Sequence, residues 1–157
     1  MTTRIPGASV WEQELYDTLA HHVGSESDII DQYRMLSEET SSEAFRYLTR
    51  LILEDEERHH RLFADLADTV EAFSQLNDRG QPIPFMSEPG SDRARIAEQT
   101  EHFLKVEHDD LKELRQLSKR LRPVRDTTLW ELLVELMEMD TRRHIRILEF
   151  IRDNMGR

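Results

Sequence analysis

Residues 51–63 read LILEDEERHHRLF, a stretch that predicts a helix. With Leu48 and Leu66 it places apolar residues at a spacing near 3.6, the period of an amphipathic helix. Glu56 and His59 lie three residues apart, and therefore on the face of that helix that carries apolar residues. A carboxylate and an imidazole that face an apolar core are costly unless a partner compensates them, and a metal ion is one such partner.

Composition limits the classes of function. The chain has 157 residues, of which 38% are hydrophobic and 34% charged, as in a single soluble and largely helical domain. The formal net charge of −11 argues against binding to nucleic acid or to an anionic membrane. Residues 1–10 lack the apolar run of a signal peptide, and no run approaches a membrane span, so we expect a cytoplasmic protein. Because cysteine is absent, any metal must be held by histidine and carboxylate ligands.

The apolar periodicity predicts an all-α fold with four helices, at about residues 10–36, 43–75, 91–121 and 127–153. Residues 1–8 are expected to form a flexible arm. Ser41 or Ser42 is a suitable N-cap for the second helix, and Asp126 or Thr127 for the fourth. Glycines and prolines in the connection at about 76–91 exclude regular helix. A link of this length suits a crossover between two helical hairpins, so residues 9–155 are predicted to form a single four-helix bundle domain.

The two hairpins also show signs of an internal repeat. A shift of 85 positions, from 59 to 144, places His59 on His144 and Asp55 on Asp140. Apolar positions agree under the same shift, although any two amphipathic helices can be aligned in that way. The coincident aspartate and histidine make the match more than periodicity.

Polar side chains interrupt the apolar faces near the middle of all four helices, in the order Glu26, Glu56, His59, Glu107, Asp140 and His144. In a bundle they would converge on one level. This ordered set resembles the ferritin-like superfamily, in particular bacterioferritin and rubrerythrin. That pattern has a Glu, then Asp-Glu-x-x-His, then a Glu, then Asp-Glu-x-x-His on successive helices. The resemblance spans most of residues 10–152, and Tyr33 stands seven residues after the first Glu, as in many members.

The resemblance implies two metal ions, with iron the first expectation and manganese or zinc as alternatives. Glu26 and His59 would hold one ion, Glu107 and His144 the other, and Glu56 would bridge them. Asp55 and Asp140 would each accept the N–H of the histidine on the opposite helix, and Tyr33 would hydrogen-bond a ligand carboxylate. The resemblance further implies reaction with O₂ or peroxide, and a homo-oligomer, either a dimer or larger.

Thr141 departs from the family pattern, which has its second bridging Glu at this position. Two ferrous ions carry a charge of +4, whereas Glu26, Glu56 and Glu107 together supply −3. A neutral hydroxyl is a poor ligand for a hard cation. We therefore expect a weaker second metal or a site for one ion, unless Asp140 or Asp110 substitutes for the missing carboxylate.

Several interpretations remain open at this stage. Glu57 and His60 form a second Glu-x-x-His, which we interpret as a solvated flank of the helix. His22, one turn before Glu26, is interpreted as a core or rim residue rather than a ligand. The function hypotheses are a metal-binding protein with undecided di-iron or mono-metal oxidoreductase activity, a metal-free bundle that acts as an interaction or assembly module, and an iron-storage cage.

Overall fold

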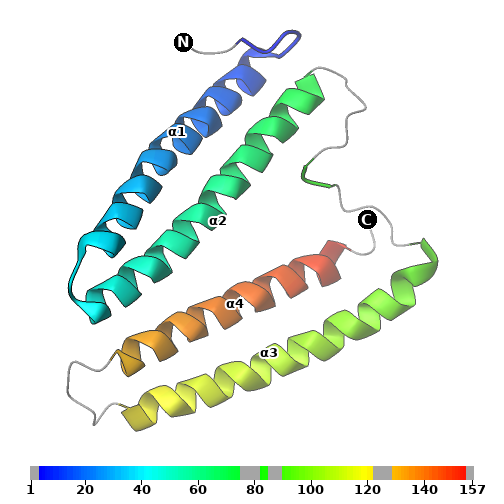
Figure 1. The fold of residues 1–157 in the computed structure, drawn as a ribbon. Helices are drawn as coiled ribbons and strands as arrows, with labels where there is room; N and C mark the ends of the chain where they lie inside the picture. The colour runs from blue at the N-terminus through cyan, green and yellow to red at the C-terminus, as the bar shows by residue number, and fades with distance from the viewer. Residues whose placement is uncertain (1–3, 75–81, 85–89, 122–128, 155–157) are drawn as a thin grey trace. The chain divides into compact units, whose positions relative to one another are not determined.

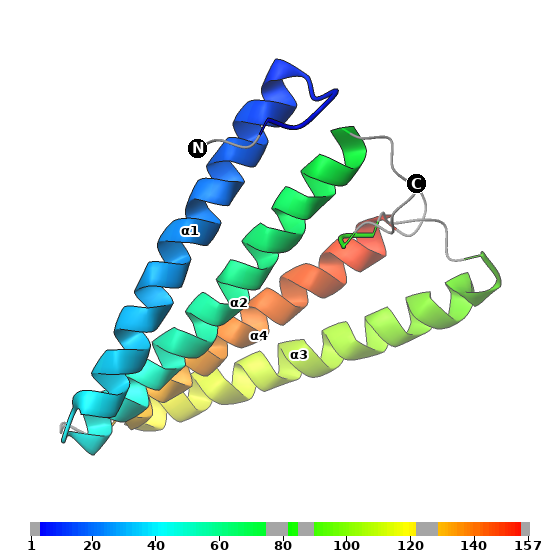
Figure 2. The same ribbon diagram turned by 45° about the horizontal axis from the view of Figure 1, so that its top comes forward.

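The computed structural model describes residues 4–74, 82–84, 90–121 and 129–154. Within these ranges the chain is helical and contains no strand, and its elements are α1 (Val10–Glu39), α2 (Glu43–Ser74), a short 3₁₀ helix (Gly90–Asp92), α3 (Arg93–Leu121) and α4 (Trp130–Asn154). Helix α1 packs against α2, and α3 packs against α4, as two views show (Figure 1, Figure 2). The prediction of an all-α chain with four helices in two hairpins is confirmed.

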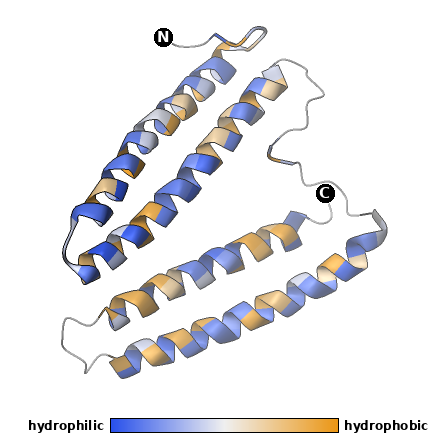
Figure 3. Ribbon diagram, viewed as in Figure 1, coloured by the Kyte–Doolittle hydropathy of each residue, from blue (hydrophilic) through white to orange (hydrophobic). Residues whose placement is uncertain are grey.

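The chain divides into two compact units, Met1–Pro84 and Phe85–Arg157, and each contains one hairpin. In the first unit the buried apolar residues of the helices include Leu19, Ile30 and Ala67. In the second unit Leu104, Leu111 and Ile145 form a buried cluster, against which Leu148 packs. Polar and apolar residues alternate along every helix (Figure 3), and this pattern sets which side chains turn towards the partner helix.

Helix boundaries differ from the prediction at two places. Helix α1 ends at Glu39 rather than near residue 36. An arginine of α2 stabilises the extra turn, since Arg46 donates to the carbonyls of Ser37 at 3.2 Å and Thr40 at 2.6 Å. Helix α4 begins at Trp130 rather than near residue 127. The predicted caps Asp126 and Thr127, and most of the predicted crossover, lie outside the described residues.

Both helices of the first hairpin begin with a capping serine. The Ser9 hydroxyl accepts from the Glu12 amide at 3.3 Å, and the Glu12 carboxylate accepts from the Ser9 amide at 2.6 Å. Hydrogen bonds from Ser9 hold the pKa of Glu12 below its usual value. The Ser42 hydroxyl accepts from the Phe45 amide at 3.3 Å, so Ser42, one of the two predicted candidates, is the cap of α2.

Part of the segment predicted as a flexible arm contacts the first hairpin. Ile5 is only 3% exposed, and its amide donates to the Gln13 side chain at 2.8 Å. The amide of Ala8 in turn donates to the Ile5 carbonyl at 3.3 Å. Residues 1–3 lie outside the described ranges. The chain before α1 is therefore held in place from residue 5 onward by burial and by backbone hydrogen bonds.

Two glycines of the first hairpin should respond in opposite ways to alanine. Gly7 has a φ of +85°, and a Cβ there would lie 3.1 Å from the Ser74 carbonyl oxygen. Gly24 lies within α1, and a Cβ there would meet nothing within 4 Å. We expect Gly7→Ala to lower the free energy of unfolding by about 1–3 kcal/mol, and Gly24→Ala to raise it by about 0.5–1 kcal/mol. Urea unfolding of both variants checks this, and shifts of the same sign would contradict it.

Candidate metal centre

Three of the predicted metal ligands come together within the first hairpin. Glu26 of α1 faces Glu56 and His59 of α2, and one ligand atom from each residue lies within 4.8 Å of the other two. Glu56 and His59 are three residues apart on one helical face, so the helix itself places both beside the partner helix. His59 Nδ1 lies 4.0 Å from Glu56 Oε2. Among the described residues, this is the only group of three or more such side chains that is so compact.

The burial of this cluster suits a bound cation. Glu26 Oε2 is buried, and no described residue forms a hydrogen bond with it. A carboxylate oxygen in that state is costly unless a cation or a water compensates it. The side chain of Glu56 is 25% exposed and that of His59 is 46% exposed, so the cluster is closed on one side and open on the other.

The donor atoms also suit a divalent transition metal. Ligands at about 2.0–2.2 Å from a common ion lie roughly 3–4 Å apart, so small side-chain rotations would bring this cluster to bonding distance. Two carboxylates and one imidazole are ligands that iron, manganese and zinc all accept. The cluster Glu26, Glu56 and His59 therefore fits one such ion in donor type, number and spacing.

An aromatic contact lies one helical turn from the cluster. The ring of His22 stacks on Phe63 with a centroid separation of 4.9 Å and an interplanar angle of 14°. His22 precedes Glu26 by four residues on α1, and Phe63 follows His59 by four residues on α2. His22 is exposed and is not part of the ligand group, so its contact joins the two helices beside the cluster.

The second hairpin contains the matching but incomplete set. His144 Nδ1 lies 3.3 Å from Glu107 Oε2, so the imidazole on α4 and the carboxylate on α3 contact each other directly. Thr141 stands at the position that corresponds to Glu56 under the 85-residue shift, and it is buried with 7% exposed. A hydroxyl therefore replaces the carboxylate that completes the cluster of the first hairpin.

Asp110 and Asp140, the two predicted substitutes for that carboxylate, are both exposed. They line a cleft of about 660 Å³ between α3 and α4, together with Thr141 and His144. Asp140 forms an ion pair at 3.0 Å with Arg143 on its own helix. Neither aspartate belongs to a compact ligand group in the described part of the second hairpin.

Two of the predicted supporting residues, Asp55 and Asp140, have partners that we did not predict from the sequence. Asp55 pairs with Arg58 at 2.8 Å, just as Asp140 pairs with Arg143. Both helices share the pattern Asp-x-x-Arg-His, and this repeat was the signal that could have revealed the pairs. Tyr33 is half-buried on α1, and no hydrogen bond joins its hydroxyl group to another described residue. The proposed roles of these residues around a metal stay predictions.

Comparisons with protein-family models, with curated proteins and with solved structures found no match to this chain. None of the helices in the described ranges is both long enough and apolar enough to span a membrane.

Proposed function

We propose that this chain is a non-heme metal-binding protein in which Glu26, Glu56 and His59 hold one divalent ion, either iron or manganese. The observation that carries the proposal is the compact ligand group, in which the buried Glu26 Oε2 forms no hydrogen bond with any residue of the described ranges. One divalent ion neutralises the two carboxylates, while the imidazole binds as a neutral ligand. An ion at this place would therefore relieve both the unpaired oxygen and the repulsion between Glu26 and Glu56.

The three protein ligands would leave coordination positions of the bound ion open for a reaction. Three protein ligands do not complete the coordination of iron or manganese, so further positions stay available for water or a small molecule. The His59 side chain is 46% exposed, which allows access from solvent on that side. Bound iron or manganese would supply one-electron redox chemistry towards O₂ or peroxide. The proposal therefore includes oxidoreductase activity of the metal-bound protein.

Titration of the metal-free, full-length protein with Mn²⁺ tests the proposal. We expect about one equivalent to bind by calorimetry, because three close donors occur only in the first hairpin among the described residues. Binding to the folded state alone also stabilises it, by about 2.7 kcal/mol when free metal is 100 times the dissociation constant. The melting temperature should therefore rise with Mn²⁺ concentration. No heat of binding and an unchanged melting temperature, with Mn²⁺ and with Fe²⁺ under argon, would contradict the proposal.

The second hairpin favours an alternative in which the helices serve as a metal-free interaction or assembly module. Glu107 and His144 satisfy each other at 3.3 Å, and no third close donor joins them among the described residues. If this alternative holds, cells carrying Glu56→Ala will keep the protein's role. Membership of the ferritin-like superfamily, a second ion and a homo-oligomer stay predictions, and measuring the native particle's mass would test the iron-storage cage.

A further inference from the structure

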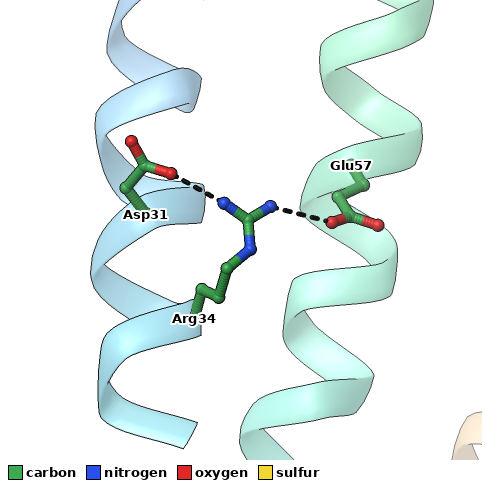
Figure 4. Close-up of polar contacts among 3 residues, drawn as sticks. All are labelled: Asp31, Arg34 and Glu57. Carbon is green, nitrogen blue, oxygen red and sulfur yellow. Dashed lines mark hydrogen bonds and ion pairs between the residues drawn. The ribbon is translucent and has the colours of Figure 1, made fainter. Parts of the chain in front are cut away.

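The first hairpin carries a second Glu-x-x-His, one residue further along α2 than the first. Glu57 and His60 lie on the flank of α2, where Asp31 and Arg34 of α1 reach them. The guanidinium of Arg34 donates to Asp31 at 2.8 Å and to Glu57 at 3.2 Å (Figure 4). Asp31 of α1 and Glu57 of α2 thus both bind a cation, and this cation is the side chain of Arg34.

His60 adds a nitrogen donor to the same place. It lines a cavity of about 340 Å³ with Asp31, Arg34 and Glu57, and its buried Nδ1 has no hydrogen-bond partner in the part of the chain that the structure describes. The interpretation of His60 as a solvated residue is therefore incomplete. The donor types at this flank, two carboxylates and one imidazole, repeat those of Glu26, Glu56 and His59.

We propose that Arg34 is a tethered cation that occupies the second Glu-x-x-His face and restricts metal binding to the first. This inference rests on the proposed function of the first face. The charge of a guanidinium neutralises part of the charge of a carboxylate pair, whereas a divalent ion would neutralise all of it. The two forked nitrogens of the guanidinium also bind both carboxylates at once. Asp31, Glu57 and His60 do not form a compact ligand group among the described residues, as expected when Arg34 lies between the carboxylates.

Local charge argues for this role and against an anion site. Arg34 is already bound by two carboxylates, which leaves a net charge of −1 on the three side chains. Arg61 also lines the cavity, but it is exposed and pairs with no described carboxylate. Removal of Arg34 would free Asp31 and Glu57, whose side chains are 68% and 45% exposed and can rotate towards His60.

The test compares Zn²⁺ binding by the full-length protein and its Arg34→Ala variant. Zn²⁺ is chosen because it binds sites of this kind more tightly than Mn²⁺ or Fe²⁺. We expect one additional equivalent in Arg34→Ala, weaker than the first because the new ligands are more exposed. Arg61→Ala removes the same charge from the same cavity but not from the carboxylate pair, so it should gain no equivalent. Arg34→Lys, which keeps a cation, should also match the wild type.

The added equivalent should disappear again in the double variant Arg34→Ala with Asp31→Asn, which shows where it binds. If Arg34→Ala binds no more Zn²⁺ than the wild type, the inference is overturned, while one equivalent in both proteins leaves the proposed function intact. If the wild type binds none, the proposed function fails. In that case a gained equivalent in Arg34→Ala still supports the role of Arg34, and no gain overturns it.

Discussion

Replacing Glu56 with alanine will reduce the metal bound by the full-length protein from about one equivalent to nearly none. Glu56 is one of three donors that lie within 4.8 Å of one another, and it supplies half of the negative charge of that group. Loss of a group that only supports a ligand already weakens metal binding by about 10- to 100-fold. We expect the loss of a charged ligand to exceed about 100-fold. Elemental analysis after dialysis against metal, together with calorimetry, measures both quantities.

Neighbouring residues provide matched controls on the same helix. Glu54→Ala removes an exposed carboxylate two residues earlier, and His60→Ala removes the imidazole that follows His59. Both variants should keep about one equivalent. His59→Ala and Glu26→Gln should behave like Glu56→Ala. If Glu54→Ala loses as much metal as Glu56→Ala, the overall negative charge of the helix, and not the cluster, attracts the ion.

The variant Thr141→Glu should bind one more equivalent of Mn²⁺ than the wild type. Thr141 corresponds to Glu56, and Glu107 and His144 are already in contact at 3.3 Å. The added carboxylate would supply a third donor beside Glu107 and His144, which the described residues of the second hairpin do not provide. Because Thr141 is buried, the carboxylate should also lower the melting temperature of the metal-free protein, and added Mn²⁺ should restore it.

A variant at an exposed position of α4 separates ligation from charge. Met139→Glu adds the same charge two residues earlier, where the side chain is 57% exposed. It should neither gain an equivalent nor destabilise the metal-free protein. If Thr141→Glu remains folded but binds no additional Mn²⁺, the missing carboxylate is not the reason why the second hairpin binds no metal ion.

Much of the architecture was predictable from local sequence. Apolar periodicity located all four helices. The serines before the second amphipathic segment located the N-terminus of α2, where Ser42 caps the helix. The three-residue spacing of Glu56 and His59 placed both on the face that meets α1, where the structure also has Glu26. These features depend on residues that are close in sequence or on the fixed period of a helix.

The features that sequence analysis missed depend on long or flexible side chains that reach across the hairpin. Arg46 extends α1 by binding the carbonyls at its end, and Arg34 joins α1 to Glu57. Periodicity cannot indicate which of several nearby carboxylates an arginine selects. The pairing of Asp55 with Arg58 within α2 was missed for a different reason, since the ferritin-like resemblance implied a histidine as the partner of this aspartate.

The position of the bound metal tests most directly whether Glu26, Glu56 and His59 are its ligands. Crystals of the full-length protein grown with Mn²⁺ should show an anomalous scattering peak at about 2.0–2.3 Å from Glu26, Glu56 and His59, as expected for bonds to carboxylate and imidazole donors. We expect this peak in the wild type and no peak at this position in Glu56→Ala. A wild-type structure without a peak among these three side chains, or with its strongest peak elsewhere, would contradict this expectation.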